Sequence, residues 1–153
     1  MSIPIPYIIV AMLLLLGSIL LTYRSKKESI PEIKIPNLPP YVFYTMMWII
    51  TYGIILYVWI EFNRRVNWPA FNVLVLINLI LNFLWVYVFF TLQDPRISFI
   101  IGILLLSSTI GIIIQVWSQP ALRNILFINV AWLILLVFTN YRINSFTKKT
   151  PQF

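Results

Sequence analysis

Five apolar stretches with no charge well inside them constrain this chain more than any other feature of its sequence. They run over about residues 3–23, 41–62, 69–92, 97–118 and 121–141. A helix of about 20 apolar residues crosses the roughly 30 Å hydrocarbon core of a bilayer. Backbone polar groups in lipid must be satisfied within the spanning element, so each stretch is expected to be helical. The sequence therefore predicts an all-α integral membrane protein, a five-transmembrane-helix bundle forming one domain over residues 1–153.

Composition and proline placement support these spans. Of the 153 residues, 61% are apolar and 10% are charged, whereas soluble domains are about 45–50% apolar and about 25% charged. Because a proline at a helix start removes no helical hydrogen bond, the prolines at or just before four spans mark their starts: Pro40, Pro69, Pro95 and Pro120. Residues 24–40 are expected to form a long first loop, and residues 142–153 a basic tail.

The basic residues predict an orientation in the membrane. Five spans place the two termini on opposite sides, and one side has only Arg64, Arg65 and Arg123. The side of the C-terminal tail collects eight basic residues: Arg24, Lys26, Lys27, Lys34, Arg96, Arg142, Lys148 and Lys149. Cytoplasmic loops carry the excess of Lys and Arg, so the C-terminus and the first loop are expected in the cytosol. These residues form no nucleic-acid reader motif; the lipid bilayer, through its anionic headgroups, is the expected partner.

Two absences narrow the chemistry. The chain has no cysteine and no histidine, which excludes thiolate zinc sites, His-ligated haem, and Cys or His nucleophiles. Neither a metal nor a cofactor is therefore expected. Proton relays and ion-coupled pumps need ionisable groups inside the spans, so an energised transporter is disfavoured.

The polarity inside the spans is neutral and lies in stripes. In the second span Tyr44, Trp48 and Tyr52 recur every four residues, which keeps them on one helical face. The third and fifth spans carry similar stripes of amides and aromatics: Asn78, Asn82, Trp85 and Phe89, then Asn129, Trp132 and Asn140. Aromatic faces with a few orienting amides suit a large, flat, mostly apolar ligand. The predicted ligand-binding residues are Tyr44, Trp48, Tyr52, Asn78, Asn82, Trp85, Trp132 and Asn140.

Simpler interpretations of the same residues stay open. Asn and Ser in membrane helices often serve only as hydrogen-bonded links between helices. A bundle with no cavity between the stripes would favour that function, a structural partner of another membrane protein. Tryptophans near span ends are often interfacial anchors, and this is the expectation for Trp59, Trp68 and Trp117.

Three spans carry residues in a recognisable order. The second opens with a proline pair, an aromatic, a tryptophan and a tyrosine: Pro39, Pro40, Tyr44, Trp48 and Tyr52. The third contains Asn78, Leu79, Leu81, Asn82, Trp85, Phe89 and Phe90, and the fifth keeps Trp132 and Asn140. In these residues the chain resembles the TspO/MBR family, the tryptophan-rich sensory or translocator proteins (peripheral benzodiazepine receptors).

The chain also departs from the family pattern. Ile128 and Asn129 stand where a Pro-Tyr pair is usual, and Thr139 stands where a Leu is usual. In the first loop, which lids the ligand cavity in the family, Ile35 and Asn37 replace the usual Pro and Trp.

The resemblance implies a five-helix receptor or carrier that binds a porphyrin or other tetrapyrrole, or a sterol, inside the bundle. It also implies homodimers, as many members form. Some members are linked to light-dependent porphyrin breakdown by two cavity tryptophans, whose places correspond to Trp48 and Trp132. We expect a non-enzymatic binding protein, with such photo-oxidative degradation as the alternative. Bacterial membrane, mitochondrial outer membrane and endoplasmic reticulum remain open as locations.

Overall fold

A computed structural model describes residues 5–27, 41–66 and 68–147, and five α-helices make up almost all of these residues. They are α1 (Ile5–Lys27), α2 (Tyr41–Arg65), α3 (Pro69–Val86), α4 (Pro95–Gln115) and α5 (Pro120–Thr147). The end of α3 continues as a π-helical turn, η1 (Tyr87–Leu92). The predicted all-α five-helix bundle is confirmed.

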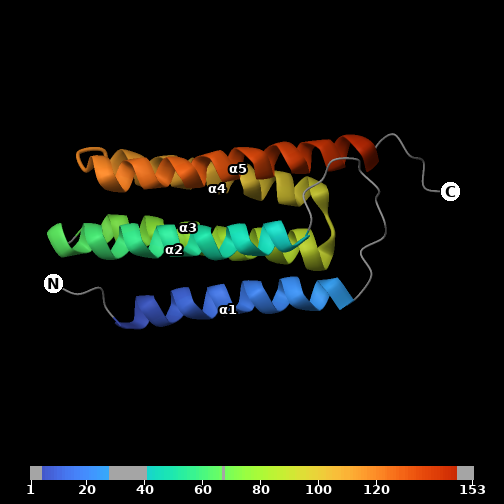
Figure 1. Ribbon diagram of the computed structural model, residues 1–153, viewed down its shortest axis with the longest axis horizontal. Coiled ribbons are helices and arrows are strands. Elements are labelled where there is room, and N and C mark those ends of the chain that lie inside the picture. The colour runs from blue at the N-terminus through green and yellow to red at the C-terminus, as the bar shows by residue number, and fades with distance from the viewer. Residues whose placement is uncertain (1–4, 28–40, 67, 148–153) are drawn as a thin grey trace.

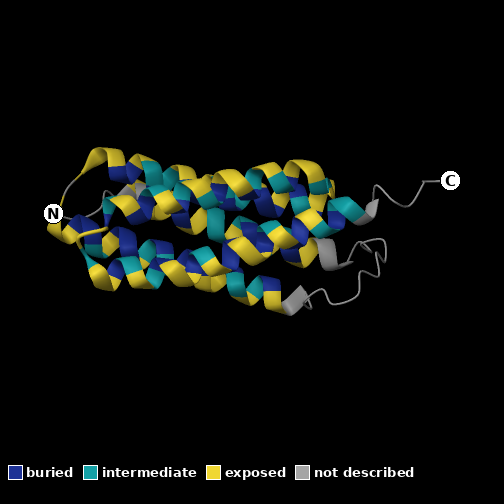
Figure 2. Ribbon diagram, turned by 90° about the horizontal axis from the view of Figure 1, so that it is seen from above, coloured by how far each residue is buried: buried dark blue, intermediate teal, exposed yellow. Residues whose placement is uncertain are grey.

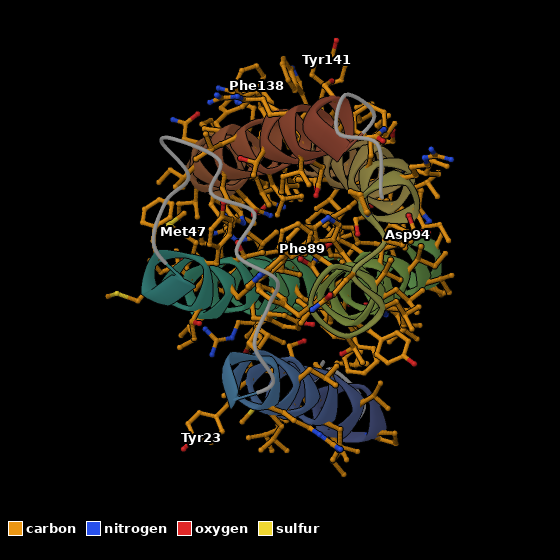
Figure 3. All side chains as sticks on the ribbon, turned by 90° about the vertical axis from the view of Figure 1, so that its right-hand side faces the viewer. Tyr23, Met47, Phe89, Asp94, Phe138 and Tyr141 are labelled. Carbon is orange, nitrogen blue, oxygen red and sulfur yellow. The ribbon has the colours of Figure 1, made fainter. Side chains whose placement is uncertain are left out.

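The helices lie side by side in three layers (Figure 1). α4 and α5 form one outer layer, α2 and α3 the middle layer, and α1 lies alone on the other side (Figures 1 and 3). Contacts run in a ring from α1 to α2, α5, α4 and α3 and back to α1. Helices that are distant in sequence, α2 and α5, therefore face each other across the interior.

The outer surface of the bundle is suited to lipid. Leu and Ile side chains are exposed on every helix, whereas most of the asparagines are buried (Figure 2). Four helical segments are long and apolar enough to cross a membrane: Phe43–Arg65, Pro69–Leu92, Pro95–Gln115 and Pro120–Ser145. At 1.5 Å per residue, the 23 residues of α1 extend about 34 Å, also enough to cross. The chain is a multi-pass integral membrane protein.

Several helices are longer than the apolar stretches that predict them. α1 ends at Lys27, α2 at Arg65 and α5 at Thr147, whereas the sequence predicts ends at residues 23, 62 and 141. The predicted first loop and tail thus begin in helix. The difference arises because hydropathy marks where the chain leaves hydrocarbon, while Arg, Lys and Ser residues continue a helix readily into water. The rest of that loop, including Lys34, Ile35 and Asn37, and Lys148 and Lys149 of the tail lie outside the described residues.

The connection between α3 and α4 is tightly organised. Gln93 follows η1 in the left-handed conformation, with φ 53°. Asp94 then caps α4, its Oδ1 accepting hydrogen bonds from the backbone N–H groups of Arg96 (2.9 Å) and Ile97 (3.0 Å). Pro95 occupies the first helical turn, where it is tolerated. This turn fixes the end of η1, which carries Phe89 and Phe90 to the interior.

α1 packs through a glycine and a serine. A Cβ at Gly17 would lie 2.8 Å from Cε2 of Phe83, so glycine permits the close approach of α1 to α3. The adjacent Ser18 lies with its Oγ 3.2 Å from the Tyr52 hydroxyl of α2. The Gly17-Ser18 pair therefore joins α1 to both helices of the middle layer.

Candidate functional site

Five aromatic side chains meet between the middle layer and the α4–α5 layer. They are Tyr44 and Trp48 of α2, Trp85 of α3, Phe89 of η1 and Trp132 of α5, and we call them the aromatic cluster. Figure 3 shows Phe89 directed into the space between the layers, whereas Tyr23, Phe138 and Tyr141 point outward. The cluster therefore occupies the interior near the end of the bundle where η1 lies.

The rings of the aromatic cluster are in mutual contact. The centroid of Trp48 lies 5.1 Å from that of Trp85 and 6.1 Å from that of Trp132. Phe89 stacks on Trp85 at 4.6 Å and 14°, and Tyr44 lies 5.8 Å from Trp132. These distances fall in the range for attractive aromatic pairs. The structure thus brings together four of the predicted site residues: Tyr44 and Trp48 of the second span, Trp85 of the third and Trp132 of the fifth.

The three tryptophans of the cluster are deeply buried, yet their polar atoms are unused. Trp48, Trp85 and Trp132 are 2%, 1% and 3% exposed, and none of their indole Nε1 atoms has a hydrogen-bond partner among the described residues. A buried indole N–H ordinarily finds an acceptor. Leaving such a donor unpaired in an apolar interior costs about 1–3 kcal/mol. The aromatic cluster thus holds three adjoining indole donors without an acceptor among the described residues.

Two predicted amides share this property. Asn82 on α3 and Asn140 on α5 are buried. In the part of the chain that the structure describes, Oδ1 of Asn82 and both amide atoms of Asn140 have no partner. α4 approaches the same region through Gly102, where a Cβ would lie 3.8 Å from Nε1 of Trp85. The cluster is therefore bordered by neutral donors and acceptors that are available to a ligand.

Asn78 and Tyr52, in contrast, have partners on neighbouring helices. Nδ2 of Asn78 donates to Ser108 Oγ (2.8 Å) and Thr109 Oγ1 (2.9 Å) of α4, and its Oδ1 accepts from Asn82 (3.1 Å). The Tyr52 hydroxyl lies 3.2 Å from Ser18 Oγ and donates to the Leu79 carbonyl oxygen (3.5 Å). These groups face α4 and α1, so the structure gives both side chains links between helices.

η1 adds Phe89 to the aromatic cluster. The sequence indicates this residue only through its spacing from Trp85. Phe89 follows Trp85 by four residues, and in the wider π turn Phe90 also remains buried, with its ring edge-on to Trp85 at 6.1 Å. π turns inside helices occur often at functional sites. Phe89 belongs to the third-span stripe but not to the predicted site residues, and nothing in the local sequence indicates the π turn.

The expectation that Trp59 is an interfacial anchor is wrong. Trp59 is fully buried, and its Nε1 donates to Asn72 Oδ1 at 2.7 Å, joining α2 to α3. Phe62 and Phe71 pack beside it with centroids 4.1 Å apart. Trp59 lies near the end of its predicted span, which suggests an anchor. Its buried partner Asn72 lies on another helix, so position along the span does not indicate this hydrogen bond. Trp68 and Trp117 are 46% and 58% exposed, as anchors are.

The chemistry available here is stacking and neutral hydrogen bonding. Among the described residues no group of three or more His, Cys, Asp or Glu side chains could hold a metal ion. The aromatic cluster offers flat apolar faces, and its border offers indole and amide groups. Such a site favours a planar, mostly apolar ligand with a few polar atoms.

Comparison with known proteins gives one result. The sequence profile of the TspO/MBR family matches residues 7–146, almost the whole chain. No curated protein and no solved structure gives a significant match. The matched region contains the aromatic cluster, the bordering amides and nearly all of the five helices. With this match over nearly its full length, the chain belongs to the TspO/MBR family.

Proposed function

We propose that this protein is a membrane receptor or carrier that encloses a planar apolar ligand, a porphyrin or other tetrapyrrole, within the helix bundle. The observation that carries the proposal is the set of three adjoining, buried indoles with unpartnered N–H groups. Family membership supports the class of protein, and the site supports the class of ligand.

The residues divide between stacking and orientation. Trp48, Trp85 and Trp132 would contact the ligand with their faces and edges. Tyr44 would border the ligand near the N-terminal end of α2. Asn82 and Asn140 would exchange hydrogen bonds with its polar atoms. Because the rings are in mutual contact, the indoles would turn apart to admit a ligand between them. Each indole N–H would then donate a hydrogen bond to an acceptor atom of the ligand.

Porphyrin binding by a double variant tests the proposal. Trp48→Phe with Trp132→Phe retains aromatic packing but removes two indole donors. At about 1 kcal/mol for each lost hydrogen bond, the Kd for protoporphyrin IX should rise roughly thirtyfold. The change in porphyrin absorbance during titration of detergent-solubilised protein measures it.

The matched control is Trp68→Phe with Trp117→Phe, two exposed tryptophans outside the site. This variant should bind as the wild type does. Equal affinity of the site variant and the control variant, with both folded, would reject the proposed site. Displacement of bound porphyrin by cholesterol would add sterols to the ligand class.

Photo-oxidative porphyrin degradation is a second candidate, favoured by one observation. Trp48 and Trp132 lie edge to face at 6.1 Å and both contact the same buried region, where excited porphyrin could oxidise an indole. Illumination of the complex in air separates the two candidates. Reversible binding without loss of porphyrin supports a receptor; light-dependent loss that requires Trp48 supports an enzyme.

We also propose that the C-terminus and the first loop face the cytosol. The helix ends place Arg24, Arg96 and Arg142 at one end of the bundle. Arg64, Arg65 and Arg123 lie at the other end, while the larger share of the basic residues lies on the side of the tail. The excess of positive charge supports this orientation.

A further inference from the structure

Asn129 of α5 is a buried amide whose oxygen is hydrogen-bonded, in contrast to its nitrogen. Its side chain is 1% exposed. Oδ1 accepts a hydrogen bond from Thr51 Oγ1 of α2 at 3.1 Å, and Nδ2 has no partner within residues 5–27, 41–66 and 68–147. Because Thr51 holds the oxygen, the amide nitrogen is directed elsewhere and keeps both of its hydrogens available.

This pair lies directly beside the aromatic cluster. Thr51 follows Trp48 by three residues on α2, and Asn129 precedes Trp132 by three residues on α5. Residues three apart are neighbours on one helical face, and the two tryptophans contact each other at 6.1 Å. The Thr51–Asn129 bond is therefore one turn, about 5 Å, farther from Tyr44 along the bundle than the Trp48–Trp132 contact. It forms the inner end of the cluster, opposite Tyr44.

Asn78 and Asn129 differ in how many of their hydrogen-bonding groups are used. Asn78 uses two donor contacts and its acceptor in bonds to side chains on α3 and α4. Asn129 makes one interhelical bond, and its Nδ2 has no acceptor among the described residues. Joining α2 to α5 requires only the bond that it already makes. The free donor, next to the unpaired N–H groups of Trp48 and Trp132, completes a set of three donors at this end of the site.

We propose that Asn129 determines ligand specificity: its Nδ2 donates to a neutral acceptor at the inner edge of the bound ligand. Thr51 is a positioning residue that fixes the amide in this orientation. The inference rests on the proposed function and narrows it to planar apolar molecules whose leading edge carries a carbonyl oxygen or a similar acceptor.

Three planar probes of nearly equal shape test the inference: fluorenone with one acceptor, carbazole with one donor, and fluorene with neither. Each is titrated against the full-length protein loaded with protoporphyrin IX in lipid nanodiscs, and displacement gives its Kd. Asn129→Leu removes the donor at similar volume. At about 1 kcal/mol, loss of one neutral hydrogen bond should weaken fluorenone roughly fivefold and leave carbazole and fluorene unchanged. Thr51→Val should weaken fluorenone in the same direction.

Asn72→Leu is the matched control, a buried amide at the opposite end of α3 from the cluster. It should leave the ratio of the fluorenone and fluorene Kd values as in the wild type. An unchanged ratio in Asn129→Leu would overturn the inference, as would an equal loss for all three probes, which indicates a structural role. If Asn129→Leu fails to fold, the ratio in Thr51→Val decides by the same criterion.

The two proposals fail in different ways. If the wild-type protein does not bind protoporphyrin IX, the proposed function fails and the inference with it. If it binds protoporphyrin IX but none of the probes displaces it, only the inference is contradicted. The preference of the wild type for fluorenone, lost on removal of Asn129, supports both.

Discussion

At the scale of single residues, the indole N–H groups distinguish structural tryptophans from site tryptophans. Trp59 is as deeply buried as Trp85, but its N–H is paired with Asn72 at 2.7 Å. The N–H groups of Trp48, Trp85 and Trp132 are buried and unpaired. Because a paired donor stabilises the bundle and an unpaired one destabilises it, substitutions at the two kinds of site should have opposite consequences.

The Trp59–Asn72 hydrogen bond should contribute to stability and not to ligand binding. Trp59→Phe leaves Asn72 Oδ1 without this donor, and we expect a loss of about 1–3 kcal/mol in the free energy of unfolding. The Kd for protoporphyrin IX should not change. Unfolding of reconstituted protein in denaturant, together with porphyrin titration, measures both.

A double variant provides the check. Once Trp59 is phenylalanine, adding Asn72→Leu should destabilise the protein much less than Asn72→Leu does alone, because the bond is already gone. Strictly additive losses would show that the two side chains act independently, against this assignment.

The sequence predicts which residues share a face but not which amides are occupied. Asn78, Asn129 and Asn140 all belong to predicted stripes, since a period of 3.6 residues is visible along the chain. Their partners depend on the rotation and distance of neighbouring helices, which periodicity does not contain. Thus Asn78 bonds to α4 and Asn129 to α2, while the Asn140 amide has no partner in the described ranges.

At the scale of helices, α1 packs closely against α3 at Gly17. Gly17→Leu would place a side chain where Cε2 of Phe83 already lies, 2.8 Å from an ideal Cβ. We expect a loss of about 1–3 kcal/mol, typical of overpacking. The thermal unfolding midpoint of the purified protein should fall accordingly.

The compensating change is Phe83→Ala, which opens space opposite residue 17. Gly17→Leu should destabilise the Phe83→Ala protein less than it destabilises the wild type. The assignment of this contact fails if the Phe83→Ala background gives no relief. Gly53, which has no atom within 4 Å of its ideal Cβ, serves as the control, and Gly53→Leu should not lower the unfolding midpoint.

Helix existence is easier to predict here than helix geometry. Long uncharged stretches and prolines at their starts predict five helices because lipid leaves few alternatives. The π turn at Tyr87–Leu92 and the left-handed Gln93 have no counterpart in the pattern. They depend on how η1 packs against α1 and α4, which is tertiary information.

At the scale of the whole molecule, orientation can be measured because the chain contains no cysteine. Gln93→Cys and Ser118→Cys place single thiols in exposed turns at opposite ends of the bundle. A membrane-impermeant maleimide added to intact cells should label the Ser118→Cys protein when it lies in the plasma membrane. The Gln93→Cys protein should react only after permeabilisation. The reverse pattern would contradict the proposed orientation.

The central claim is that a planar ligand enters between the layers and pairs the buried indoles of the aromatic cluster. The six tryptophans allow a direct measurement, because each indole N–H gives its own ¹H–¹⁵N resonance. On addition of protoporphyrin IX to the reconstituted protein, the resonances of Trp48, Trp85 and Trp132 should shift. Those of Trp59, Trp68 and Trp117 should stay in place. Bound porphyrin with the first three resonances unchanged would contradict the account.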